Sequence, residues 1–166
     1  MASCLIVDDE PLSRDVLRKY IFEVKDLDLV AECSNAAEAS HELNLTRVDI
    51  LFLDINMPGL SGISFARSLR RSPLIIFTTA YPEYAVEGFE LDATDYLVKP
   101  YSFERFLKAV NRALDRLQEN QAEDTEGKIL VKADKKLYAL LFSEILLIEG
   151  QGDYIRIRTD RENLVV

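Results

Sequence analysis

The chain has 166 residues, 48% of them hydrophobic, and a formal net charge of −9 at pH 7. This length allows one domain or one domain with a further segment, and the apolar content is enough for a packed core, which excludes an intrinsically disordered chain. The negative charge argues against nonspecific binding of nucleic acid by the whole chain. The lack of a basic leader and of an apolar run of ~18–20 residues predicts a cytoplasmic protein that does not enter a membrane.

Short β-branched runs alternate with longer amphipathic runs over residues 1–120. The short runs predict strands at Cys4–Val7, Asp28–Cys33, Asp49–Leu53, Leu74–Thr78 and Tyr96–Val98. Apolar residues at helical spacing predict helices at Pro11–Val24, Ala36–Leu45, Leu60–Arg70, Pro82–Glu90 and Ser102–Gln118.

Strands that alternate with helices form right-handed βαβ units, and strands that are nearly all apolar are typical of a sheet covered on both faces. We therefore expect an α/β fold with a doubly wound, five-stranded parallel sheet, flavodoxin-like with strand order 2-1-3-4-5. Cys4 and Cys33 lie in the first two predicted strands, where we expect reduced thiols packed in the core.

The composition changes after Gln118. Residues 118–127 are polar and acidic and end in Gly127, which predicts the end of a helix followed by a linker over 121–127. Beyond the linker the apolar residues alternate with strand period, most clearly in DYIRIRTD (Asp153–Asp160). We expect one domain over 1–120 and a β-rich segment over 128–166.

Carboxylates end two of the predicted strands, Asp8 and Asp9 after the first and Asp54 after the third. In an open sheet of order 2-1-3-4-5, ligands bind beyond the carboxyl ends of strands 1 and 3, where the strand order reverses. Three carboxylates in one crevice repel each other, and a hard divalent cation with oxygen ligands relieves that repulsion. The sequence therefore predicts a Mg²⁺ site.

Two further polar residues, Thr79 and Lys99, end the fourth and fifth strands and would lie at the same edge. A carboxylate such as Asp54 can attack phosphorus to give an acyl phosphate. Lys99 would neutralise charge on the transferring group, and the Thr79 hydroxyl could meet a phosphoryl oxygen. Each residue alone has a plainer role, as a helix cap, turn, strand-end or solvated residue, so it is their common position at the strand ends that favours a phosphoryl site.

Residues 3–118 resemble the receiver domain of bacterial two-component response regulators. The matching segments, in chain order, are VDDE (Val7–Glu10), LDINMPG (Leu53–Gly59), FTTA (Phe77–Ala80) and DYLVKP (Asp95–Pro100). The resemblance implies that Asp54 accepts a phosphoryl group from a sensor histidine kinase. It also implies that Mg²⁺ is bound by Asp9, Asp54 and the backbone carbonyl of Asn56, with Asp8 helping through water.

The same resemblance assigns roles in switching. Thr79 would be the hydroxyl switch residue, and Lys99 would pair with the phosphoaspartate. Tyr96 would be an aromatic switch residue whose ring moves inward on activation. The peptide bond between Lys99 and Pro100 is expected to be cis, which is a minority state for bonds that precede proline.

The C-terminal segment resembles the start of a LytTR-type DNA-binding domain, most strongly in IEGQGDYIRIRT (Ile148–Thr159). The chain stops at Val166, short of the length of that module, so we expect an incomplete domain with exposed strand edges, which invite pairing with another chain. Six basic residues could form part of a basic face, namely Lys132, Lys135, Lys136, Arg156, Arg158 and Arg161.

These observations predict a response regulator of the LytTR (LytR/AlgR) family that accepts a phosphoryl group on Asp54 and switches a DNA-binding, transcription-regulating output domain. The alternative is a stand-alone receiver that acts through protein contacts without binding DNA. A homodimer could form through the face at Pro82–Leu117 or through the exposed tail strands. We expect no enzymatic activity beyond Mg²⁺-dependent self-phosphorylation and autodephosphorylation.

Two other protein classes fit less well. Hydrolases of the haloacid-dehalogenase type also form an aspartyl phosphate, but their nucleophile lies in a DxD motif after the first core strand. Here the first strand ends in an adjacent pair, and the candidate nucleophile ends the third strand. A flavodoxin-like FMN protein needs a phosphate loop rich in Ser, Thr and Gly after strand 1, which PLSRD (Pro11–Asp15) does not provide.

Overall fold

The computed structural model describes residues 1–70, 73–84, 92–125, 127–133, 136–151, 154–159 and 163–165. The chain divides into two compact units, Met1–Leu117 and Gln118–Val166. Among the described residues, no helix combines the length and the apolar character needed to cross a membrane.

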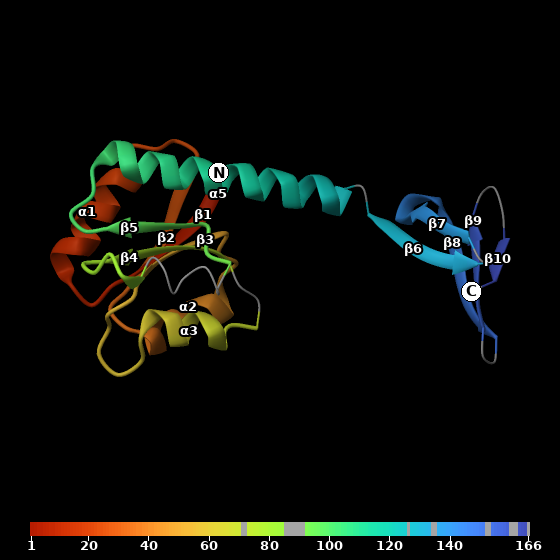
Figure 1. Ribbon diagram of the computed structural model, residues 1–166, viewed down its shortest axis with the longest axis horizontal. Coiled ribbons are helices and arrows are strands. Elements are labelled where there is room, and N and C mark those ends of the chain that lie inside the picture. Colours follow the sequence, from red (N-terminus) through yellow and green to blue (C-terminus); the bar gives the residue numbers. More distant parts are fainter. Residues whose placement is uncertain are drawn as a thin grey trace. The chain divides into compact units, whose positions relative to one another are not determined.

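A parallel sheet of five strands forms the centre of the first unit (Figure 1). The strands are β1 (Ala2–Val7), β2 (Leu27–Cys33), β3 (Ile50–Asp54), β4 (Leu74–Thr79) and β5 (Asp95–Val98). Their order across the sheet is β2-β1-β3-β4-β5, which confirms the predicted fold class and strand order. Every residue of the central strand β3 is buried, as expected where helices cover both faces of a sheet.

Among the described residues, two helices lie on each face of this sheet. Their bounds are α1 (Pro11–Phe22), α2 (Ala36–Leu45), α3 (Gly62–Ser68) and α5 (Phe103–Thr125). Helices α1 and α5 lie on one face, and α2 and α3 lie on the other (Figure 1). On the first face Phe52 of β3 stacks on Phe106 of α5, with ring centroids 5.4 Å apart. On the second face Leu51 of β3 and Phe65 of α3 share one buried cluster.

Local sequence signals explain where the helices begin. Proline stands at the first turn of α1, where its missing N–H costs no hydrogen bond. Asn35 caps α2, and its side chain accepts a hydrogen bond from the Glu38 N–H. The Ser102 hydroxyl accepts a hydrogen bond from the Arg105 N–H at 3.1 Å at the start of α5.

Helix α5 is longer than predicted. The sequence predicted an end near Gln118, but the helix continues to Thr125 and takes in most of the segment expected to be a linker. Residues 118–125 contain no Gly or Pro, and five of the eight are Gln, Glu or Ala, which favour helix even when the segment is polar. The predicted helix at Pro82–Glu90 falls mostly on residues 85–91, which lie outside the described part of the chain.

The second unit is built from antiparallel strands, in line with the β-rich segment predicted for this region. Strand β6 (Lys128–Ala133) pairs with β7 (Lys136–Leu141). A second sheet has the order β10-β9-β8, formed by β8 (Ile145–Gln151), β9 (Tyr154–Thr159) and β10 (Asn163–Val165). The small core of this unit draws on both sheets and consists of Val131, Ala133, Leu140, Ile157 and Leu164. Several large apolar side chains of this unit stay exposed, among them Leu146 at 63% and Ile148 at 53%.

Candidate functional site

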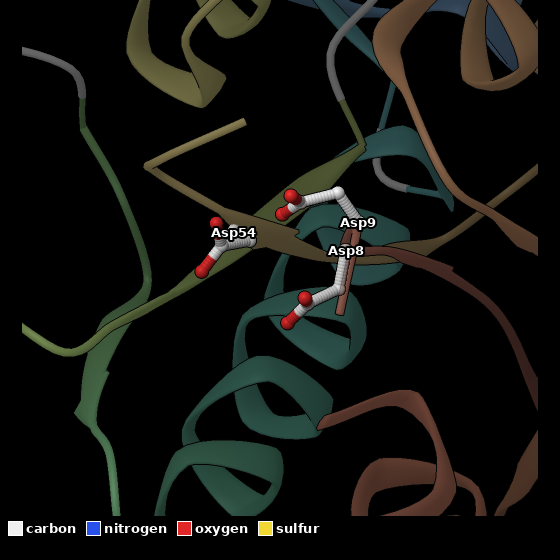
Figure 2. A group of neighbouring side chains, drawn as sticks. All are labelled: Asp8, Asp9 and Asp54. Atoms are coloured by element: carbon white, nitrogen blue, oxygen red, sulfur yellow. The ribbon is translucent and has the colours of Figure 1, made fainter. Parts of the chain in front are cut away.

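Carboxylates gather at the carboxyl edge of the first sheet, where β1 and β3 end side by side. Strand pairing sets Val7 opposite Leu53, so Asp8 and Asp54 follow at neighbouring positions. Asp8, Asp9 and Asp54 each place one carboxylate oxygen within 4.8 Å of the others (Figure 2). Asp8 is 0% exposed and Asp54 is 4% exposed, whereas Asp9 faces solvent. The structure thus brings together the three acidic residues that the sequence singled out.

Lys99 binds two of these carboxylates. Its Nζ donates to Asp8 Oδ2 at 2.8 Å and to Asp54 Oδ1 at 2.9 Å, and it lies 4.0 Å from Glu10 Oε2. Burial alone would lower the pKa of Lys99, but the hydrogen bonds to Asp8 and Asp54 outweigh burial and raise that pKa above its ordinary value. Lys99 therefore stays protonated and offsets part of the negative charge of the cluster.

The Asp54 carboxylate remains in an unfavourable position despite this contact. Burial raises the pKa of Asp54, the hydrogen bond from Lys99 works against that rise, and the charges of Asp8 and Asp9 add to it. The net effect is a raised pKa, so the ionised side chain is less stable here than in water. A divalent cation bound by these oxygens would relieve the strain, and a cluster of acidic oxygens with room beside it is the type of site that Mg²⁺ occupies in proteins.

Room for such a ligand exists beside the cluster. A hollow of about 330 Å³ is lined by Asp9, Glu10, Asp54, Asn56, Ala80, Tyr81 and Lys99. Asn56 lies in the loop that follows β3 and is exposed. The hollow thus holds the Asp54 carboxylate, the Lys99 ammonium and the Asn56 loop within one small volume.

The two residues expected to take part in switching lie beside the hollow rather than on its wall. Thr79 is fully buried, and its hydroxyl accepts a hydrogen bond from the Tyr81 N–H at 3.0 Å. The Tyr96 ring stacks on Phe77 with centroids 5.3 Å apart, and its hydroxyl is buried without a partner among the described residues. Burial raises the pKa of Tyr96 to about 12. The Tyr96 side chain is partly buried and packs against the apolar cluster that contains Phe77 and Phe65.

The remaining sequence expectations concern the backbone and the thiols. The peptide bond between Lys99 and Pro100 is cis. Cys4 and Cys33 are both free and buried, and burial raises the pKa of the Cys33 thiol to about 11. Neither thiol is set up as a nucleophile, because the thiolate form is disfavoured.

Two residues that shape the site have little or no signal in the sequence. A Cβ at Gly62 would collide with the Asp54 carbonyl oxygen, so the close approach of α3 to the end of β3 requires glycine there. Arg14 of α1 donates from its guanidinium to the Asp8 carbonyl oxygen at 2.6 Å. A glycine placed just after the Ser61 helix cap is a weak signal for the first contact. The sequence carries no signal for the second.

Comparison with known proteins identifies relatives of the first unit. Residues 4–111 match the family described as "Response regulator receiver domain". The transcriptional regulatory protein BtsR of Escherichia coli is 46% identical over 114 residues, which cover 68% of this chain and 48% of BtsR. The chain therefore spans about half the length of that relative. The response regulatory domain of mrkE from Klebsiella pneumoniae is 32% identical with a TM-score of 0.65, over 70% of this chain and 98% of that one.

Other relatives extend over both units or carry a ligand. The sensory transduction protein LytR of Staphylococcus epidermidis is 34% identical, in an alignment that covers 96% of this chain and 71% of LytR. LytT of Enterococcus faecalis is 30% identical over 95% of this chain and 69% of its own. The response regulator TrrA of Thermotoga maritima, solved in complex with Mg(2+)-BeF, is 31% identical with a TM-score of 0.60, over 68% of this chain and 99% of that one.

Proposed function

This chain belongs to the response regulator receiver family, and on that premise we propose that it accepts a phosphoryl group on Asp54 from a sensor histidine kinase. One observation carries the proposal. The Asp54 carboxylate is almost fully buried at the end of β3, held by Lys99 at 2.9 Å and accompanied by two further carboxylates. A buried carboxylate beside two others is poorly solvated and is repelled by its neighbours. Such a group is typical of a site that binds a cation or carries out a reaction.

The proposed reaction is a phosphoryl transfer. A carboxylate oxygen of Asp54 attacks the phosphorus of a phosphohistidine on the kinase, and a new P–O bond forms as the P–N bond breaks. The electron pair of the broken bond stays on the imidazole nitrogen, which takes a proton from solvent. The Lys99 ammonium, which contacts Asp54 Oδ1, neutralises charge on the transferring group. In this proposal the chain is itself the acceptor, and its own chemistry is limited to Mg²⁺-dependent self-phosphorylation and autodephosphorylation.

The family resemblance assigns the residues that would hold Mg²⁺. Asp9 and Asp54 would supply carboxylate oxygens, Asn56 would supply its backbone carbonyl, and Asp8 would act through water. Oxygen donors of this kind suit Mg²⁺, which keeps several waters and binds through one or two carboxylates. Bound Mg²⁺ would supply positive charge to the phosphoryl oxygens.

The switch that we propose begins at Thr79. In this structure the Thr79 hydroxyl accepts a hydrogen bond from the Tyr81 N–H. On phosphorylation that bond would break, and the hydroxyl would donate to a phosphoryl oxygen on Asp54. To move a two-state equilibrium from 1:99 to 99:1, phosphorylation must favour the active state by about 5.5 kcal/mol. One hydrogen bond to a charged group contributes only about 1.5–3 kcal/mol, so Thr79, Lys99 and the bound cation must act together. Tyr96 would report the change through its contact with Phe77.

The output of the whole protein is proposed to be control of transcription in the cytoplasm, through a complete C-terminal DNA-binding domain. Support comes from the likeness to LytR and LytT, which extends over both units, and from the description of BtsR as a transcriptional regulatory protein. In β9, Arg156 and Arg158 lie exposed on one face of the strand, where phosphate groups could be reached. A protein whose complete form bound no DNA would instead be a stand-alone receiver acting through protein contacts.

Homodimer formation is proposed for the same protein, through the face at Pro82–Leu117 or through the tail strands. The tail strands have the stronger support within the described residues. Leu146 and Ile148 of β8 and Ile155 of β9 are each about half exposed or more, and exposed apolar strands tend to pair with another chain.

The direct test of phosphoryl acceptance uses a small phosphodonor. We expect acetyl phosphate with Mg²⁺ to add one phosphoryl group to the wild-type chain, detected by intact-mass spectrometry. The variant Asp54→Ala should not be labelled. The matched control Asp26→Ala removes an exposed carboxylate away from the cluster and should be labelled like the wild type. Labelling of Asp54→Ala would refute the assignment.

A further inference from the structure

Two arginines on one side of α1 hold the end of β2. Arg14 and Arg18 are four residues apart and therefore face the same way on the helix. Arg18 binds the Glu32 carboxylate through two hydrogen bonds, at 2.5 and 2.9 Å. The Arg14 Nε lies 3.9 Å from Glu32 Oε2, while its Nη1 donates to the Asp8 carbonyl oxygen at 2.6 Å. Of these two arginines, Arg14 is the one that connects Glu32 to the edge of the sheet that carries the acidic cluster.

The contact reaches the peptide that joins two of the proposed metal ligands. The Asp8 N–H still pairs with β2, donating to the Cys33 carbonyl at 3.1 Å, but β1 ends at Val7 and the Asp8 carbonyl has left the ladder. That carbonyl belongs to the Asp8–Asp9 peptide plane, so the hydrogen bond from Arg14 fixes the direction in which the chain enters Asp9. The Arg14 side chain is only 20% exposed. Its guanidinium is a charged donor, which makes a stronger hydrogen bond than a neutral one.

The Asp8 and Asp9 side chains are held very differently. Asp8 Oδ1 accepts from the Glu10 N–H at 2.9 Å, and Asp8 Oδ2 accepts from Lys99. Asp9 is exposed, and it depends on its backbone for its place in the cluster. A rotation of the Asp8–Asp9 peptide would move the Asp9 carboxylate away from Asp54 while leaving Asp8 bound to Lys99.

We propose that Arg14 is a positioning residue for the metal site. By binding the Asp8 carbonyl oxygen, it fixes the Asp8–Asp9 peptide and so holds the Asp9 carboxylate beside that of Asp54. Glu32 lies beside the Arg14 guanidinium and keeps it from swinging toward the carboxylates, where it would compete with a cation. This inference rests on the proposed function, because it assumes that Asp9 and Asp54 bind Mg²⁺.

The test compares two variants that lose the same ion-pair partner. Arg14→Gln removes the contact to the Asp8 carbonyl as well as that to Glu32, whereas Arg18→Gln removes only contacts to acidic side chains. Loss of a residue that orients a metal ligand weakens metal binding by about 10- to 100-fold. By isothermal titration calorimetry, we expect Arg14→Gln to bind Mg²⁺ at least ~10-fold more weakly than the wild type. Arg18→Gln should stay close to the wild type, although both variants lower the melting temperature.

Two further measurements separate positioning from general stability. In Arg14→Gln the backbone amide of Asp9 should exchange with deuterium faster than in Arg18→Gln. Arg14→Lys should recover part of the Mg²⁺ affinity, because an ammonium can donate to the Asp8 carbonyl but lacks the planar fork that also reaches Glu32. If Arg14→Gln does not fold, Arg14→Lys tests the proposal in its place. Its Mg²⁺ affinity is expected to lie a few-fold below that of the wild type.

The possible failures are distinct. Equal Mg²⁺ affinity in the wild type and the Arg14 variants would overturn this inference and leave the proposed function intact. So would an equal loss in Arg14→Gln and Arg18→Gln, since that would show a general effect of α1 docking on β2. A wild-type chain that binds no Mg²⁺ and takes no label from acetyl phosphate would overturn the proposed function and this inference together.

Discussion

Replacing Asp54 by Asn should make the metal-free protein more stable at neutral pH. Asp54 has two like-charged neighbours whose oxygens lie within 4.8 Å, and at an effective dielectric constant of about 20 each repulsion is roughly 3.5 kcal/mol or more. The attraction to Lys99 at 2.9 Å is about 6 kcal/mol on the same scale. The balance is a net repulsion of ~1 kcal/mol, to which the cost of burying the charge is added. We expect Asp54→Asn to raise the free energy of unfolding by about 1–2 kcal/mol at pH 7.

The pH dependence gives this prediction its sign. The pKa of Asp54 in the folded state is raised above its ordinary value of 3.8, so the native state binds more protons than the unfolded state between these two values. The contribution of Asp54 to wild-type stability therefore falls as the pH rises through that window, so the stability difference between Asp54→Asn and the wild type develops across the window and vanishes below pH 3.8.

Urea denaturation at several pH values, without Mg²⁺, measures this difference. The control Asp26→Asn, at an exposed position, should stay within about 0.5 kcal/mol of the wild type. Addition of Mg²⁺ should then stabilise the wild type more than Asp54→Asn, by about 1.4 kcal/mol at ten times the dissociation constant. If Asp54→Asn were less stable than the wild type at pH 7 without Mg²⁺, the account of Asp54 as a strained anion would be wrong.

Other residues around the site and core give further predictions. Gly62→Ala should lower stability by about 1–3 kcal/mol and slow labelling by acetyl phosphate, because the new Cβ displaces the Asp54 backbone; normal labelling kinetics would contradict this. Tyr81→Ala should shorten the lifetime of phosphorylated Asp54, measured by the decay of the phosphorylated mass, because its ring is 51% exposed at the hollow where water must enter. An unchanged decay rate would show that the Tyr81 ring does not slow hydrolysis of the phosphoaspartate. Phe106→Ala should cost about 3–5 kcal/mol in urea denaturation, since the ring is fully buried against Phe52; a loss below ~1 kcal/mol would mean that this core is not packed as described.

The meeting of Asp8, Asp9 and Asp54 was predictable because it follows from topology. Parallel strands end at one edge of a sheet, and apolar runs show where each strand ends. A pattern read along one chain can thus bring together residues that are 45 positions apart, such as Lys99 and Asp54. The positions of the five strands and of most helices follow from local patterns of this kind.

Features that depend on side-chain direction could not be predicted in this way. The position of Tyr96 in β5 is visible in the sequence, but the packing of its ring against Phe77 depends on the whole cluster under α2 and α3. The Arg14 contact joins a helical side chain to a backbone carbonyl, and many surface arginines make no such contact. The end of α5 was misjudged because polarity was taken as a sign of a linker, whereas helix propensity prevailed as far as Thr125.

Locating the phosphoryl group within the chain tests the central claim most directly. The wild-type protein is labelled by acetyl phosphate with Mg²⁺ and then treated with borohydride, which reduces an aspartyl phosphate to homoserine, and peptide mass spectrometry finds the altered residue. We predict homoserine at position 54 alone, and none in samples prepared without Mg²⁺. Reduction at Asp8 or Asp9 with Asp54 intact, or a label that resists borohydride, would contradict the account.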